Sequence, residues 1–199
     1  HIREGVYFHD KPPTNGREMT AHDVVFSLNR LWDTPTSYHY NVFPRETHIE
    51  SITATDNWTV VIQTVPGKLK PVFERSSTAS KIVPPEVIEA YGDMADWRNS
   101  VGTGPFMLVD YVDGSSATFE RNPNYWMKDP LHPENTFPYL DGVKMIIIQD
   151  KSTRLAALRT GKIDSVYGLT WEDGESLMTT NPELKWIKYP TAAPPALFM

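Results

Sequence analysis

The sequence contains no cysteine among its 199 residues. That absence excludes disulfide bonds, thiolate metal sites and cysteine nucleophiles. It also lacks an uninterrupted apolar run of about 18 residues, the length that a helix needs to cross a bilayer. The chemistry of cysteine and a membrane-spanning helix are therefore excluded.

A basic cluster is missing as well. The formal net charge is −6 at pH 7, and no run of Lys and Arg interrupts the acidic balance. This charge argues against nucleic acid and against an anionic membrane surface as partner. The composition, 40% hydrophobic and 22% charged, is typical of a folded globular chain. A chain of this length buries roughly 70% of its unfolded surface, so it needs no disulfides to form a core.

The residue patterns of common catalytic and metal sites are also absent. Gly102-Thr103-Gly104 lacks the third glycine of a phosphate loop, and Pro105 removes an N–H that such a loop needs, so we predict a structural turn. The six histidines include no pair four residues apart and form no ligand set with carboxylates. No serine lies in a Gly-x-Ser-x-Gly elbow. We therefore expect no metal site and no cofactor, and we predict a protein that is not an enzyme.

Residues 1–84 predict a small domain of mixed α+β structure. Thr20 and Asp23 have the spacing of a capping box, and the amphipathic run that follows predicts a helix to Trp32. Turn residues at 56–58 separate two β-rich runs and predict a hairpin. The expected elements after the first helix are strands at 49–55 and 59–65, a short helix at 69–74, and a strand at 81–83.

Residues 85–199 predict a second, α/β part, with the domain boundary near Pro84. The continuous apolar run at 143–149 is typical of a strand that is buried on both faces. It is followed by a helical pattern and a further strand, an order that predicts a parallel pair with a right-handed crossover. The expected elements are helices at 87–91, 151–160 and 171–180, strands at 106–111, 117–121, 143–149, 163–167 and 186–189, and a Pro-rich loop at 128–142.

Three segments resemble one known family in the family's own order. They are HIREGVYFHDKPPTNGREMTAHDVVFSLNRL at the N-terminus, VGTGPFMLVDYVDGSSATFERNPNYW at 101–126, and RLAALRTGKIDSVYG at 154–168. Together they resemble the family 5 extracellular solute-binding proteins of ABC transporters, which include dipeptide, oligopeptide and nickel-complex receptors. The resemblance covers nearly the whole chain. Two stretches depart from it by their length, the turn HDKPPTNGREM and the segment KDPLHPENTFPYLDG.

The resemblance implies a fold and a function. The fold would be α/β, a lobe of the type II periplasmic-binding-protein kind with a small hairpin-containing domain inserted, and incomplete. Because relatives are several hundred residues long, we expect an internal fragment whose leader lies upstream. The function would be capture of a peptide or similar small solute by closure of two lobes, and delivery to an ABC permease. A monomer in the periplasm or outside the cell, with lipid tethering as one option, is expected.

Five residues are candidates for the solute site. Tyr38, His39 and Tyr40 lie in a polar loop, where aromatic rings line clefts as readily as they pack a small core. The resemblance favours Tyr38, which matches the tyrosine of a Ser-x-Tyr segment at the ligand cleft of oligopeptide receptors. Tyr167 ends a predicted strand, where α/β folds bind ligands, and its alternative is an ordinary core position. Lys81 lies near the place where nickel-complex receptors carry an arginine.

Two other functions stay open on the sequence. One is a cell-envelope hydrolase on an α/β scaffold, and the other is a regulatory module that reuses the receptor fold. An enzyme would place an acid or base of strongly perturbed pKa in a cleft. The residues do not name the solute.

Overall fold

The computed structural model of the protein describes residues 1–187, apart from the side chains of residues 75, 78 and 79. The chain divides into two compact units, His1–Ile146 and Ile147–Met199, which are described separately. Helices and strands alternate in the mixed manner that was predicted. The boundary near Pro84, which concerns the domains of a whole receptor, stays a prediction. The expected strand at 186–189 extends beyond the described residues.

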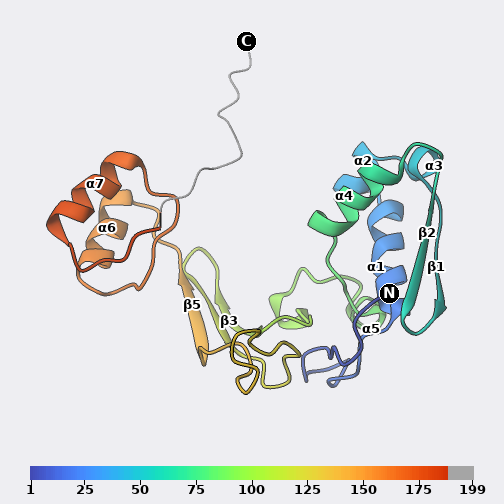
Figure 1. Ribbon diagram of the computed structural model, residues 1–199, viewed down its shortest axis with the longest axis horizontal. Coiled ribbons are helices and arrows are strands. Elements are labelled where there is room, and N and C mark those ends of the chain that lie inside the picture. The colour runs from blue at the N-terminus through green and yellow to red at the C-terminus, as the bar shows by residue number, and fades with distance from the viewer. Residues whose placement is uncertain (188–199) are drawn as a thin grey trace, which may run out of the picture. The chain divides into compact units, whose positions relative to one another are not determined.

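The first core of the larger unit lies between one helix and one hairpin (Figure 1). Helix α1 (Ala21–Asp33) packs against the antiparallel strands β1 (Ile49–Asp56) and β2 (Thr59–Thr64). The predicted helix and hairpin are confirmed. The turn at 56–58 closes as the residue types indicate, because the Asp56 carboxylate accepts a hydrogen bond from the Trp58 N–H at 2.7 Å. The buried residues of this core are Leu28, Trp32, Ile49, Ile52 and Val72.

The start of α1 is fixed by a charged network. Asp23 accepts the Thr20 backbone N–H at 2.8 Å and the Arg17 guanidinium at 2.6 Å. The same guanidinium also binds Glu86 of helix α5 (Pro85–Tyr91). Burial of Asp23 acts to raise its pKa, but the hydrogen bonds from Arg17 and Thr20 outweigh burial, so the net pKa of Asp23 is lowered. Arg17 therefore links α1 to α5.

A second core gathers around Phe8, Val87 and Val101. Helix α5, predicted at 87–91, is confirmed and begins at Pro85, where a proline suits the first turn. Helix α4 (Leu69–Ala79) is confirmed but continues five residues beyond the predicted end at residue 74. Between these helices the predicted strand at 81–83 is wrong. The Val83 N–H donates to Ser27 Oγ of α1 at 2.8 Å, so a side chain takes the place of a neighbouring strand.

The second sheet has three antiparallel strands in the order β3-β4-β5. Strands β3 (Phe106–Val112) and β4 (Ser116–Arg121) form the predicted hairpin, and the 128–142 segment is the predicted loop up to Gly142. Strand β5 (Gly142–Ile146) pairs with β4.

The parallel β-α-β arrangement predicted for residues 143–167 is wrong in the described chain. β5 ends at Ile146 instead of residue 149, runs antiparallel to β4 and is exposed, with Met145 at 59%. Residues 163–167 form no strand. The apolar run indicated burial on two faces, but burial also needs covering elements, and β5 is an edge strand whose Met145 and Ile146 remain exposed.

The smaller unit contains the two predicted helices, α6 (Lys151–Arg159) and α7 (Trp171–Thr180). Asp150 caps α6 by accepting the Thr153 N–H, and Thr170 caps α7 by accepting the Asp173 N–H. The Lys151 ammonium lies 3.2 Å from the Asp173 carboxylate and joins the two helix starts. No helix within residues 1–187 has the length and apolar character to span a membrane.

Replacement of Asp23 by alanine is expected to destabilise the fold by about 2–3 kcal/mol, because it removes a buried capping carboxylate and leaves Arg17 with one carboxylate partner, Glu86. Urea unfolding measures this change. Asp33→Ala, which removes the exposed partner of Arg45, is the control and should cost about 0.5 kcal/mol.

The pH dependence has a defined sign. Since the pKa of folded Asp23 is lowered from its ordinary value of 3.8, its contribution is present above that value and is lost as the pH falls through the folded pKa. Asp23→Ala should flatten this acid limb. An equal cost for Asp23→Ala and Asp33→Ala would contradict the role given to the network.

Candidate functional site

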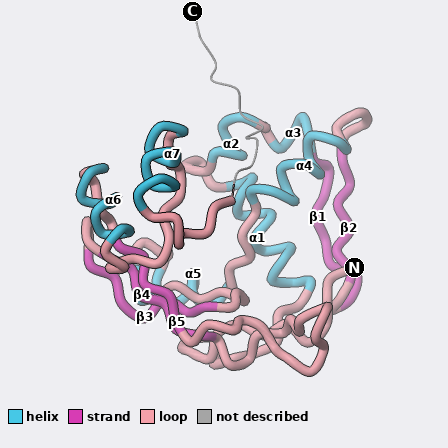
Figure 2. Tube along the Cα trace, turned by 60° about the vertical axis from the view of Figure 1, so that its left-hand side comes forward, coloured by secondary structure: helices cyan, strands magenta, loops and turns pink. Residues whose placement is uncertain are grey.

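The loop that carries the three aromatic candidates contains a short helix, α2 (Tyr38–Val42). Ser37 caps it by accepting the His39 N–H at 3.2 Å. α2 packs against the last part of α1 (Figure 2). Because successive residues of a helix point about 100° apart, Tyr38, His39 and Tyr40 cannot share one direction.

His39 points into the first core. Its side chain is 3% exposed, and its ring meets Trp32 edge to face with centroids 4.8 Å apart. Of the two roles that the sequence left open for His39, packing against the core describes this ring. A place for His39 in a ligand site stays a prediction. Tyr38 and Tyr40 are 58% and 44% exposed, which fits a surface available to a solute.

Tyr38 belongs to an aromatic ridge that we define as Tyr38, Phe43 and His48. The ring centroids of Tyr38 and Phe43 are 6.3 Å apart, and those of Phe43 and His48 are 5.5 Å apart, both pairs edge to face. Phe43 and His48 carry no sequence signal that marks them as site residues. Their contact depends on the turn at Phe43-Pro44 and on helix α3 (Arg45–His48), and no helical or strand spacing indicates it. The ridge holds the Tyr38 ring from one side.

The other two candidates lie elsewhere. Lys81 is exposed in the extended segment that Ser27 fastens to α1 two residues further on. Tyr167 is 84% exposed and lies between α6 and α7, not at the end of a strand as predicted. Tyr167 belongs to the second unit, so its pairing with Tyr38 stays a prediction, as does the role of Lys81.

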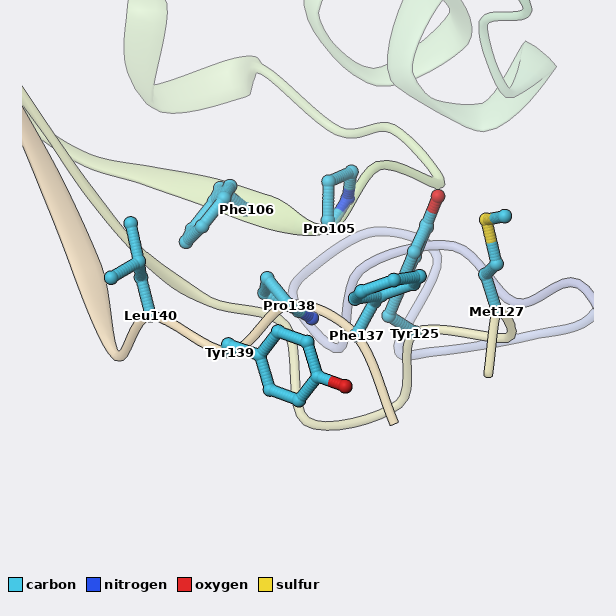
Figure 3. A pocket seen from close by; sticks show the side chains of 8 residues that line it. All are labelled: Pro105, Phe106, Tyr125, Met127, Phe137, Pro138, Tyr139 and Leu140. Carbon is cyan, nitrogen blue, oxygen red and sulfur yellow. The ribbon is translucent and has the colours of Figure 1, made fainter. Parts of the chain in front are cut away.

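An apolar hollow of about 360 Å³ lies beside β3 (Figure 3). The hydroxyl of Tyr139, one of its lining residues, is already engaged, since it donates to the buried carboxylate of Asp129. That contact lowers the pKa of Asp129 and raises the pKa of Tyr139. The mostly apolar lining offers few groups to orient a ligand. Its residues pack the loop before β5 against β3. The hollow is lined by Pro105, Phe106, Tyr125, Met127, Phe137, Pro138, Tyr139 and Leu140.

Shifted carboxyl groups elsewhere have structural explanations. A hydrogen bond from the Trp58 backbone lowers the pKa of Asp56, and threonine hydroxyls lower the pKa of Asp150 and Asp173. Each of these shifts accompanies a turn or a helix cap. Within residues 1–187 no group of three or more His, Asp or Glu side chains could hold a metal ion. The hydrolase hypothesis gains no supporting feature from this geometry.

The chain belongs to a family of bacterial solute receptors. The family model of the bacterial extracellular solute-binding proteins, family 5 Middle, matches residues 1–199. The family predicted from the three sequence segments is therefore confirmed. Relatives include the periplasmic oligopeptide-binding protein OppA of Haemophilus influenzae, 28% identical over 189 residues that make up 85% of this chain and 33% of OppA. Heme-binding protein A of the same organism is 28% identical, over 83% of this chain and 31% of that protein.

Solved structures agree with the family. The Helicobacter pylori periplasmic binding protein DppA, in complex with peptide STSA, superimposes with a TM-score of 0.69 at 28% identity, over 90% of this chain and 36% of DppA. The binding protein MoaA of A. tumefaciens R10, in complex with mannopinic acid, gives a TM-score of 0.72 at 26% identity, over 92% and 34%. The predicted periplasmic-binding-protein fold class is confirmed. The chain spans about a third of the length of these relatives.

The burial of Trp32 and the exposure of Tyr38 predict different losses in the free energy of unfolding when each ring is removed. Trp32→Ala should cost about 3–5 kcal/mol because it empties the first core beneath α2. Tyr38→Ala should cost no more than about 1 kcal/mol because more than half of that side chain is exposed. Urea unfolding midpoints measure both. A large cost for Tyr38→Ala would show that its ring is a packing residue.

Proposed function

We propose that this chain is part of the solute-binding component of an ABC importer, which captures peptides or similar small solutes by closure of two lobes. The observation that carries the proposal is the family match along all of residues 1–199. The names of relatives add the solute class, since they include oligopeptide-binding and glutathione-binding proteins. Binding is the whole task in this proposal, without catalysis.

In this proposal Tyr38 and Tyr167, which belong to different units, each contact the solute. The exposure of both rings supports this assignment, because a bound solute needs apolar surface that the fold leaves uncovered. Phe43 supports Tyr38 from behind through its edge-to-face contact. The peptide backbone would add to the site as an extended strand, with its side chains in permissive pockets. Tyr40 and Lys81 are further candidates for the rim, both exposed, and His39 would act through its hold on Trp32.

The working partner in this proposal is an ABC permease, and the receptor acts as a monomer. The place of action is the periplasm or the extracellular side, supported by relatives that are named periplasmic. A lipid tether would fit the same task at a membrane surface.

The first test uses the longest natural protein that contains this chain, purified from its own host without refolding. Native mass spectrometry should show bound mass of several hundred daltons that is released as short peptides. Release of one discrete non-peptide compound would keep the receptor function and change the solute. Absence of any bound or binding solute would contradict the proposal.

The same protein tests the two proposed solute contacts. Tyr38→Ala and Tyr167→Ala should each raise the Kd for a released peptide about tenfold, since each removes an aromatic contact of about 1–1.5 kcal/mol. Isothermal titration calorimetry measures the Kd. Tyr111→Ala is the matched control, a partly exposed tyrosine on β3 whose hydroxyl donates to Asp113. Equal effects of all three changes would remove Tyr38 and Tyr167 from the site.

Residues 1–199 alone should bind the same peptide weakly or not at all. The matched part of the chain covers 33% of the OppA length, and two-lobe capture needs walls from both lobes. Calorimetry on the 199-residue chain checks this, with circular dichroism to establish that it is folded. Nanomolar binding would overturn the view that this chain holds only part of the site.

A further inference from the structure

His9 is a buried histidine with no part in the proposed solute site. Its side chain is 7% exposed and lies where the N-terminal turn meets the segment 98–104. Two backbone contacts frame it, because the His9 N–H donates to Gly102 O at 2.8 Å and Thr14 Oγ1 donates to His9 O at 3.2 Å. Phe8, which precedes His9, and Val101, which precedes Gly102, both belong to the second core.

Both nitrogens of the His9 ring bind backbone groups. Nδ1 lies 3.3 Å from the Gly102 N, and Nε2 lies 3.1 Å from the Gly104 O. An amide N–H only donates and a carbonyl only accepts, so Nδ1 must be without a proton and Nε2 must carry one. The two partners therefore require the neutral ring in a single tautomer.

The carbonyl that His9 binds accepts a second hydrogen bond. Asn122, which is 2% exposed at the end of β4, donates from Nδ2 to Gly104 O at 3.0 Å. Its backbone N–H donates to Pro105 O at 2.8 Å. The turn that leads into β3 is thus hydrogen-bonded both to the N-terminal turn and to the end of the β3–β4 hairpin.

Protonation of the ring would break this arrangement. A proton on Nδ1 would face the Gly102 N–H, donor against donor, in a site with little water to replace the lost bond. Burial lowers the pKa of His9, with Lys11 adding repulsion, and the bond to Gly104 opposes both. Lys11 itself donates to Arg98 O at 2.8 Å, so its charge is held beside the turn. Asn122, the other side chain at this turn, is neutral, and the Asp10 carboxylate lies near Gly16.

We propose that His9 is a pH-sensitive clasp that fastens the second core to the β3–β4–β5 sheet and opens when its ring gains a proton. The clasp consists of His9, Gly102, Gly104 and Asn122. It would make the connection between these two parts of the larger unit tight at neutral pH and loose in mild acid. A receptor outside the cytoplasm meets such changes of pH directly.

Unfolding at a series of pH values tests the clasp in the longest natural protein that contains this chain. Because the folded pKa of His9 is lowered from 6.5, the contribution of the clasp is present above 6.5 and falls as the pH drops toward the folded pKa. One linked proton changes the folding equilibrium constant by at most about tenfold per pH unit. His9→Gln should remove this part of the slope. His22→Gln, at an exposed histidine on α1, should keep it.

Hydrogen exchange of the unchanged protein gives a second measurement, which does not depend on the variant being folded. After correction for intrinsic rates, a peptide that covers residues 101–106 should lose protection between pH 7.5 and 5.5. A peptide from the β1–β2 hairpin should keep its protection. The proposal is overturned if residues 101–106 stay protected in acid, or if folded His9→Gln retains the full pH slope.

Discussion

The ion pairs of the Arg17 guanidinium hold together the two cores of the larger unit. It binds Asp23 at the start of α1 and Glu86 at the start of α5, two helices that belong to different cores. Asp23 is 2% exposed, and a buried carboxylate is tolerable only with such a partner. The position of α1 then determines where the hairpin and α2 pack, and the position of α5 brings Val87 to Phe8. A planar, always charged group suits this double role better than lysine would.

The elements that the sequence predicted well are those with local causes. Thr20 and Asp23 mark the start of α1, turn residues mark the two hairpins, and Pro85 marks α5. The strands predicted at 81–83, 143–149 and 163–167 failed or were shortened because a strand exists only beside another strand. An apolar run indicates that a segment tends to be buried. The order of strands in the sheet decides which elements bury it, and no local sequence pattern contains that order.

The candidate site was predictable to the extent that it rests on residue type. The loop aromatics were recognised, but the different directions of Tyr38 and His39 follow from a five-residue helix that the loop did not indicate. Phe43 was missed because it lies five residues after Tyr38, a spacing that does not by itself indicate a shared helix face. His9 and Asn122 were missed for a related reason, since they meet at Gly104 from positions 95 and 18 residues away. The family, by contrast, followed from motifs in chain order, which tertiary contacts do not alter.

Strand β5 has a consequence for handling the chain. It lies at the edge of its sheet, with Met145 and Ile146 exposed and one charged side chain, Lys144, between Gly142 and Ile146. An edge that presents free backbone groups beside apolar side chains is a template on which a further strand can add. Copies of this 199-residue chain would therefore tend to aggregate through β5 at high concentration, and Lys144 is its main gatekeeper against cross-β growth.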